Sequence, residues 1–145
     1  MSAVSEIMSK GLQTADLASR PSVADIADIM LKNKIGSVIL LRSGKPAGIV
    51  TERDILRQIV LQKRNAGETP ASDIMSSPLI TVQSYDSVDT AAELMSKNKV
   101  KRLPVLESDG SVVGMLSVTD IAKKLAKILA DDYNRYGVLK ATMDL

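Results

Sequence analysis

Residues 22–36 read SVADIADIMLKNKIG, and residues 87–101 read SVDTAAELMSKNKVK. The two stretches align at a constant offset of 65, sharing Ser-Val at the start and Lys-Asn-Lys near the end. In both, apolar residues recur at i, i+3, i+4 and i+7, the pattern of a helix with one buried face. These positions are Val23, Ile26, Ala27 and Met30, and then Val88, Ala91, Ala92 and Met95. The repetition indicates an internal duplication.

The duplication extends in both directions from these helices. Residues 48–55 (GIVTERDI) align with 114–121 (GMLSVTDI) at an offset of 66, and residues 6–9 (EIMS) align with 73–76 (DIMS) at an offset of 67. The repeat therefore covers almost all of the 145 residues. We divide the chain into a first repeat, 1–68, and a second, 69–145, joined by the polar, turn-rich segment 65–72.

Each copy continues from its first helix into a β-hairpin and a second helix. The hairpins comprise residues 37–41 and 48–50 in the first copy, and 103–106 and 112–116 in the second. The second helices begin near Thr51 and Ser117, and their expected apolar faces are Ile55, Ile59 and Val60, and Ile121, Leu125, Ile128 and Leu129. A short strand is expected before each unit, clearest at 79–82 (LITV), whereas 13–20 has a poor β pattern.

The predicted unit is β-α-β-β-α, which gives a mixed α+β fold. A helical crossover joins the first two strands in parallel, and the hairpin makes the last two antiparallel. A unit of roughly 60 residues buries only about 60% of its unfolded surface. We therefore expect the two repeats to pack together about a pseudo-twofold axis.

Composition excludes several classes of function. With 45% hydrophobic and 25% charged residues, the chain fits one globular unit. It contains no His and no Cys, so the commonest general base, the thiolate nucleophile and most metal-ligand sets are missing. We predict that it is not an enzyme and has no catalytic cofactor and no metal site. An acidic pair in the segment 131–136 is assigned to a charged helix or a partner contact rather than to a metal.

Partners are constrained in the same way. The formal net charge is only +2, and there is no Phe or Trp to stack on bases, so nucleic acid is not favoured. No apolar run approaches the roughly 20 residues that cross a bilayer, and residues 1–10 carry charges where a signal peptide is apolar. We expect a cytoplasmic protein with no membrane partner.

The repeated Thr51-x-x-Asp54 and Ser117-x-x-Asp120 allow two interpretations. A hydroxyl followed three residues later by a carboxylate forms a helix capping box, and Ser22-x-x-Asp25 has the same form. Alternatively, a strand end that opens into a helix offers free amides and the positive end of the helix dipole to a phosphate. A carboxylate beside it can accept both hydroxyls of a ribose.

Two copies of apolar-Gly-apolar-apolar-[Thr/Ser]-x-x-Asp-Ile, each after a Ser-Val helix and a hairpin, resemble a tandem pair of CBS domains. The sequence 101–105 (KRLPV) in the second copy adds to this resemblance, which spans about residues 6–130. CBS domains are named from cystathionine β-synthase and also occur in inosine monophosphate dehydrogenase, chloride channels and the γ subunit of AMP-activated kinase.

The resemblance implies two clefts between paired repeats and an adenosine-containing ligand: AMP, ADP, ATP, S-adenosylmethionine or another adenosyl compound. It implies that Asp54 and Asp120 bind the ribose diol. It places phosphates near Thr51 and Arg53, or Ser117 and Thr119, with Lys101 and Arg102 as a further basic pair. Adenine would lie among Gly36, Ser37 and Val38, and Leu79, Ile80 and Thr81; Leu103 and Pro104 complete the candidate set.

The two copies differ at these positions. Gly36 and Ser37 stand where the second copy has Lys101 and Arg102, and Ile39 stands for Pro104, so we expect one strong site and one weak or empty site. The sequence does not assign Arg102 to either cleft. Lys97, Lys99, Lys101 and Arg102 are equally compatible with a solvated basic face.

Two functions follow as alternatives. The first is a regulatory sensor that binds an adenine nucleotide and acts on a partner protein through the state of the cleft. The second is a structural homodimeric scaffold with empty clefts, held by apolar helix faces. In either case the resemblance implies a homodimer that forms a four-repeat disc.

Overall fold

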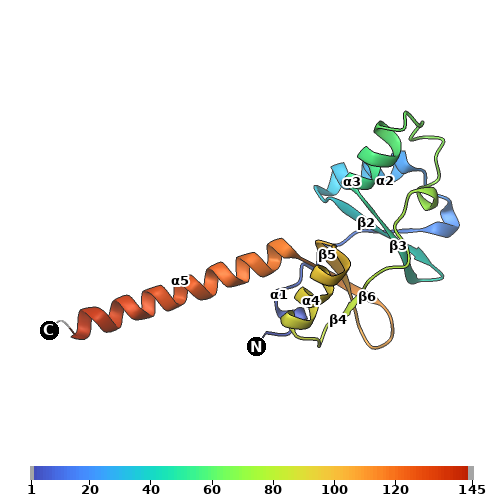
Figure 1. Cartoon of the computed structure of the whole chain (residues 1–145). Helices are drawn as coiled ribbons and strands as arrows, with labels where there is room; N and C mark the ends of the chain where they lie inside the picture. The colour runs from blue at the N-terminus through green and yellow to red at the C-terminus, as the bar shows by residue number, and fades with distance from the viewer. Residues whose placement is uncertain (1, 144–145) are drawn as a thin grey trace.

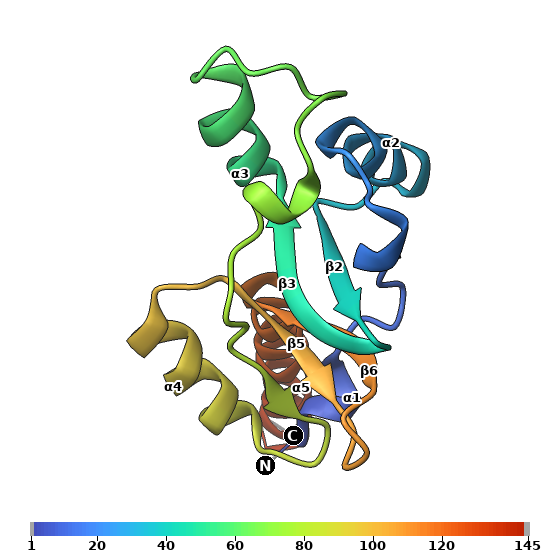
Figure 2. The same ribbon diagram turned by 90° about the vertical axis from the view of Figure 1, so that its right-hand side faces the viewer.

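The computed structural model describes residues 2–143, and their elements occur in the same order twice. In Figures 1 and 2 the first sheet, with α2 and α3, lies above the second sheet, with α4, and α5 projects from the second unit. The first half comprises α1 (Val4–Ile7), β1 (Thr14–Asp16), η1 (Leu17–Ser19), α2 (Val23–Asn33), β2 (Ser37–Arg42), β3 (Lys45–Thr51), α3 (Glu52–Ile55) and the π-helical η2 (Leu56–Val60). The second comprises η3 (Ala71–Asp73), β4 (Val82–Gln83), α4 (Val88–Asn98), β5 (Arg102–Leu106), β6 (Val112–Ser117) and α5 (Val118–Met143).

Two three-stranded sheets confirm the predicted mixed α+β class. The sheet orders are β1-β2-β3 and β4-β5-β6. In each, the first pair is parallel across a helical crossover and the second is an antiparallel hairpin. A register shift interrupts both hairpins at equivalent points, between Leu40 and Leu41 and between Val105 and Leu106. The duplication is thus preserved down to local strand geometry.

The prediction for the leading strands was wrong in detail. The clearest candidate, 79–82, contributes only Val82 to β4, because Leu79 and Ile80 line a cleft between the two units instead of joining the sheet. The poor candidate, 13–20, contains the three-residue β1, paired from Thr14 opposite Ile39. Its polar residues are tolerated because Thr14 and Asp16 face solvent.

The first helix of each unit begins and ends alike. Ser22 Oγ accepts a hydrogen bond from Asp25 N at 3.1 Å, and Ser87 Oγ accepts one from Thr90 N at 3.1 Å. Such caps satisfy amide groups that the first helical turn leaves unpaired. At the other end, Lys34 and Lys99 adopt left-handed conformations that terminate the helices.

Some predicted apolar faces are not buried. Ala92 is exposed on α4, and Val60 is 58% exposed because its neighbour Ile59 takes the core-facing position. On α5 only Ile121 of the predicted face packs against the second core. Leu125, Ile128 and Leu129 are exposed because the helix has by then left the sheet, as Figure 1 shows.

Each unit is completed by a segment from the other half of the sequence. Val4 is fully buried in the second core with Val82 and Leu116, whereas Ala71 and Ile74 belong to the first core. Backbone hydrogen bonds hold each of these segments to the unit that it completes: Val4 N donates to Asp86 O at 2.8 Å, and Ala71 N donates to Pro21 O at 2.9 Å. The boundary between 68 and 69 stays a prediction.

Two glycines allow these crossing segments to approach the sheets. Ser9 and Met115 exchange backbone hydrogen bonds of 2.8 and 2.9 Å, as do Ser76 and Ile49 at 2.9 and 3.1 Å. A Cβ at Gly114 would lie 2.8 Å from Ser9 O and 2.7 Å from Met8 Sδ. One at Gly48 would lie 2.5 Å from Met75 Sδ. The backbone of the crossing segment requires glycine at position 114, whereas at position 48 only the Met75 side chain is in the way.

We predict that Gly114→Ala lowers the free energy of unfolding by about 1–3 kcal/mol, because the new methyl group meets backbone as well as a side chain. Gly48→Ala should cost less, since the Met75 side chain can move. Chemical denaturation measures both. Gly137→Ala, with no atom within 4 Å of the added Cβ, is the control and should not destabilise the protein. Equal stability of Gly114→Ala and the wild type would contradict the packing.

Candidate functional site

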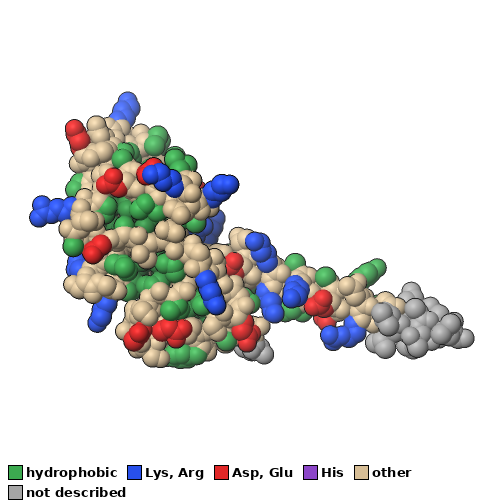
Figure 3. All heavy atoms as spheres, turned by 180° about the vertical axis from the view of Figure 1, so that it is seen from behind, with side chains coloured by type: hydrophobic (Ala, Val, Ile, Leu, Met, Phe, Trp, Pro, Cys, Tyr) green, Lys and Arg blue, Asp and Glu red, His purple; other side chains and the backbone are tan. Residues whose placement is uncertain are grey.

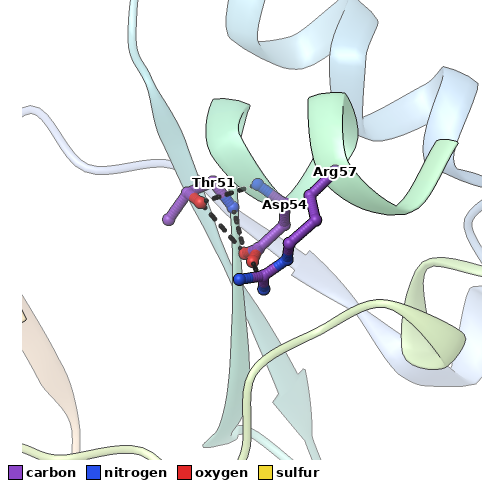
Figure 4. A network of polar contacts seen from close by, with 3 residues as sticks. All are labelled: Thr51, Asp54 and Arg57. Carbon is purple, nitrogen blue, oxygen red and sulfur yellow. Dashed lines mark hydrogen bonds and ion pairs between the residues drawn. The ribbon is translucent and has the colours of Figure 1, made fainter. Parts of the chain in front are cut away.

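The end of β3 and the start of α3 form a capping box around Thr51. Thr51 Oγ1 accepts from Asp54 N at 3.2 Å, and Thr51 N donates back to Asp54 Oδ2 at 2.9 Å. The Thr51 hydroxyl also lies 3.0 Å from Asp54 Oδ2 and donates to it. Figure 4 shows the Thr51 amide and the Thr51 hydroxyl both directed at the same oxygen of the Asp54 carboxylate. The capping interpretation of the motif is therefore confirmed.

The second oxygen of the Asp54 carboxylate faces Arg57. Arg57 Nη2 lies 3.2 Å from Asp54 Oδ1, and the two residues are one helical turn apart. The Asp54 side chain is only 7% exposed, whereas that of Arg57 is 58% exposed. A carboxylate oxygen has two lone pairs, so Oδ1 retains acceptor capacity beside Arg57. Capping by Oδ2 leaves Oδ1 able to accept from a ligand.

This carboxylate lies in a cleft built from both repeats. We name it the Asp54 cleft; its volume is about 850 Å³, within the usual range for small-molecule sites. Residues from β3 and α3 form one side, and residues after η3 and around β5 form the other. The lining residues are Gly36, Ile49, Thr51, Glu52, Arg53, Asp54, Arg57, Met75, Ser76, Ser77, Pro78, Leu79, Ile80, Lys99, Val100, Lys101, Arg102 and Pro104.

The structure brings nine of the sixteen candidate site residues together in the Asp54 cleft. They are Gly36, Thr51, Arg53, Asp54, Leu79, Ile80, Lys101, Arg102 and Pro104. The other seven do not line it. Val38 and Leu103 are fully buried in the two cores, Ser37 and Thr81 are half-buried, and Ser117, Thr119 and Asp120 lie at the start of α5.

The equivalent motif of the second repeat forms the same cap. Ser117 N donates to Asp120 Oδ2 at 2.9 Å, and Asp120 N donates to Ser117 Oγ at 3.1 Å. Asp120 is half-buried, in contrast to the buried Asp54. The two carboxylates thus have the same structural role in their helices, but only Asp54 reaches the cleft described above.

Arg102 lies in the Asp54 cleft and connects the two units. Its Nη1 donates to Gly36 O at 3.4 Å, and the same carbonyl accepts from Glu52 N at 3.1 Å. Arg102 is the first residue of β5 in the second unit, and Gly36 directly precedes β2 in the first unit, so this contact spans the cleft. The sequence left the assignment of Arg102 open; the structure places it with Asp54.

Basic residues outnumber acidic ones around the cleft. Five Lys or Arg residues against two carboxylates give the lining a formal charge of +3; they are Arg53, Arg57, Lys99, Lys101 and Arg102, opposed by Glu52 and Asp54. An excess of positive charge in a concave site concentrates anions there. Ile49, Ile80 and Val100 supply an apolar part of the same surface.

Sequence reasoning missed several lining residues. Arg57 could have been found, because a residue three positions after Asp54 lies on the same helical face. The sequence of residues 75–78 did not indicate that they line a site, since they reach the cleft through the pairing of Ser76 with Ile49.

Within residues 2–143, no group of three or more His, Cys, Asp or Glu side chains could hold a metal ion. No helix in the same range has the length and apolar character needed to span a membrane.

Comparison with known proteins identifies the family. The CBS domain model matches twice, over residues 4–61 and 71–127. The chain belongs to the CBS-domain family and contains a pair of these domains. Among curated relatives, YhcV of Bacillus subtilis, a CBS domain-containing protein, is 29% identical over 122 residues, which is 84% of each chain.

Other relatives are longer than this chain. The uncharacterized protein MK0525 of Methanopyrus kandleri is 38% identical over 101 residues, 69% of this chain but 52% of that protein. CBSX3 of Arabidopsis thaliana, a mitochondrial CBS domain-containing protein, is 32% identical over 83% of this chain and 63% of its own. The chain thus spans about half to three fifths of these two relatives.

Solved structures of CBS-domain pairs share the fold. The pair from protein MJ0100, in complex with 5'-methylthioadenosine and S-adenosyl-L-methionine, has a TM-score of 0.76 and 29% identity, covering 88% of this chain and 98% of that one. The CBS domain protein PAE2072 of Pyrobaculum aerophilum, complexed with AMP, has a TM-score of 0.74 and 31% identity, covering 82% and 89%. The ligands of both relatives contain adenosine.

Proposed function

We propose that this chain is a non-enzymatic regulatory module that binds an adenine nucleotide or another adenosyl compound in the Asp54 cleft. The observation that carries the proposal is the meeting of Asp54 with a net-positive lining in one cavity between the repeats. The AMP and S-adenosylmethionine complexes of its relatives support the ligand class. Action on a partner protein and a homodimeric disc, as the family resemblance implies, complete the proposal.

Each part of such a ligand has a counterpart in the cleft. Asp54 Oδ1 is the acceptor for the ribose hydroxyls, in competition with the exposed Arg57 side chain. The backbone around Leu79 and Ile80 and the side chain of Val100 offer an apolar slot for adenine. Lys101 and Arg102 lie across the cleft from α3, where they would meet phosphate.

Charge favours polyphosphates among the adenosine-containing ligands. A lining of formal charge +3 attracts ADP and ATP more than AMP, and disfavours the sulfonium of S-adenosylmethionine. The Asp54 cleft is thus the strong site of the two that the sequence predicts. The site at Asp120 is the weak or empty one, because the first repeat has Gly36 and Ser37 where the second has Lys101 and Arg102.

A thermal-unfolding panel tests the ligand class. We expect ATP and ADP to raise the melting temperature by about 5 °C or more at about 100 times their Kd, because a ligand that binds only the folded state stabilises it. AMP should raise it less, and S-adenosylmethionine least. A larger shift with S-adenosylmethionine than with ATP would contradict the charge argument. No shift with any of the four would favour the scaffold with empty clefts.

Matched variants of the two capping carboxylates test the site. Asp54→Asn should weaken ATP binding about tenfold or more, through loss of charge-assisted hydrogen bonds to the ribose. Asp120→Asn makes the same change in the matching capping box outside the Asp54 cleft and should leave that affinity unchanged. Titration calorimetry measures both, with unfolding curves recorded without ligand. Equal affinities in the wild type and both variants would refute the site.

A pair of exposed lysines tests the phosphate end of the site. Lys101→Met should weaken ATP binding about three- to fivefold, as expected for one exposed charge contact, and reduce its dependence on salt. Lys97→Met removes the same charge from α4, outside the lining of the cleft, and serves as the control. The same loss in both variants would mean that general surface charge, rather than the cleft, attracts the nucleotide.

A further inference from the structure

The outer part of α5 presents an apolar stripe to solvent. Leu125 is 55% exposed, Leu129 60%, Tyr133 76% and Tyr136 65%. Figure 1 shows the helix leaving the second unit as a rod, and Figure 3 shows hydrophobic side chains along it. At 1.5 Å per residue, the 26 residues extend about 39 Å. Only the first turns, around Ile121, contact the second core.

The stripe has a symmetric spacing around Leu129. Leu125 and Tyr133 lie four residues before and after it, and Ala122 and Tyr136 lie seven residues before and after it. Steps of three and four residues keep all five positions on one face of an α-helix. Rotation by 180° about an axis through Leu129 therefore maps this set of positions onto itself.

We propose that two copies of this chain pair through α5 in antiparallel orientation, with the two Leu129 side chains at the centre. In this arrangement Leu125 faces Tyr133 of the partner subunit. Ala122, a small residue, faces Tyr136 of the partner subunit, a large one, on each side of the centre. A parallel pair would instead place alanine against alanine and tyrosine against tyrosine, which fills the interface unevenly.

Charge along the helix favours the same orientation. The half of α5 before Leu129 carries Lys123, Lys124 and Lys127 against Asp120, and residues 130–136 after it carry Asp131 and Asp132 against Arg135, so the two halves have net charges of +2 and −1. Lys127 and Asp131 lie on the face opposite the stripe, so this difference acts through the net charge of each half and not through ion pairs in the interface. Antiparallel pairing brings the lysine-bearing half of one helix alongside the aspartate-bearing half of its partner. Parallel pairing brings like charges together, and it also aligns the two helix dipoles unfavourably.

This surface is distinct from the clefts and does not depend on the proposed ligand. It also differs from the four-repeat disc implied by the sequence resemblance, because the stripe lies on the part of α5 beyond the second core. Exposed leucine and tyrosine side chains grouped on one face of a soluble protein mark an interaction site. The self-complementary spacing identifies a second copy of the chain as the occupant.

The absence of native cysteine permits a clean test of orientation in the full chain. Under mild oxidation, we expect Leu129→Cys to cross-link with itself in high yield. Leu125→Cys and Tyr133→Cys should each cross-link poorly alone but efficiently when the two variants are mixed. Lys127→Cys, on the opposite face of the helix, is the control and should remain largely without a cross-link. Efficient self-cross-linking of both Leu125→Cys and Tyr133→Cys would overturn the antiparallel arrangement.

Light scattering after size exclusion then measures assembly without cross-linking. The wild type should have at least twice the chain mass of 15.5 kDa, and Leu129→Glu should weaken the α5 contact about tenfold or more and so reduce the mass of the assembly about twofold. Leu31→Glu, which makes the same change at an exposed leucine of α2, should have no effect. Circular dichroism confirms folding of each variant. A monomeric wild type at cross-linking concentrations, or an assembly unaffected by Leu129→Glu, would refute the proposal.

Discussion

The fold depends on the reciprocal pairing of each sheet with a segment from the opposite half of the chain. The backbone at Ser9 pairs with Met115, and the backbone at Ser76 pairs with Ile49. A glycine lies next to each pairing residue; a Cβ at Gly114 would overlap the backbone of the incoming segment, and one at Gly48 would overlap the Met75 side chain. Because the same exchange holds both units, the cleft between them has defined walls rather than two independently moving sides.

The cleft that results is asymmetric although the repeats are similar. The capping boxes at Thr51 and Ser117 have nearly the same hydrogen-bond lengths, so the helix starts themselves do not distinguish the two sites. The difference comes from the residues that face each helix start from the other unit. Lys101 and Arg102 face Asp54, whereas their counterparts in the first repeat are Gly36 and Ser37. The repeats thus share one backbone arrangement, and they differ in charge at the two positions of Lys101 and Arg102.

The sequence predicted the parts of the structure that repeat along the chain. The stripe of α2 and the Thr51-Asp54 motif were identifiable because helical period and capping chemistry are local properties. The strand at 79–82 was mispredicted because Leu79 and Ile80 line the cleft, and Ile80 also packs against the second core, without pairing in the sheet. Likewise, β1 is held by pairing with β2, which its own residues do not reveal.

Contacts between the halves were beyond the reach of sequence reasoning. Nothing in residues 75–78 indicates that they lie beside Asp54, because that position depends on a backbone pairing distant in the sequence. The cleft assignment of Arg102 was undecided for the same reason. Val60, Leu125 and Leu129 followed a helical pattern, yet burial also requires an opposing surface, and the described part of the chain supplies none at these positions. Periodicity therefore located apolar faces without showing which of them are covered.

The exchanged segments also bear on how such a protein could arise. A single repeat separated from its neighbour would lack the segment that pairs with its sheet, next to Gly48 in the first unit and Gly114 in the second. Its core would also lack the side chain of Ala71 or Val4, respectively. Two identical single repeats could satisfy each other by trading leading segments. The tandem chain has the same exchange of leading segments within one polypeptide, as expected if two copies of one gene were fused. Each half could then change in sequence while the other half continued to supply its segment.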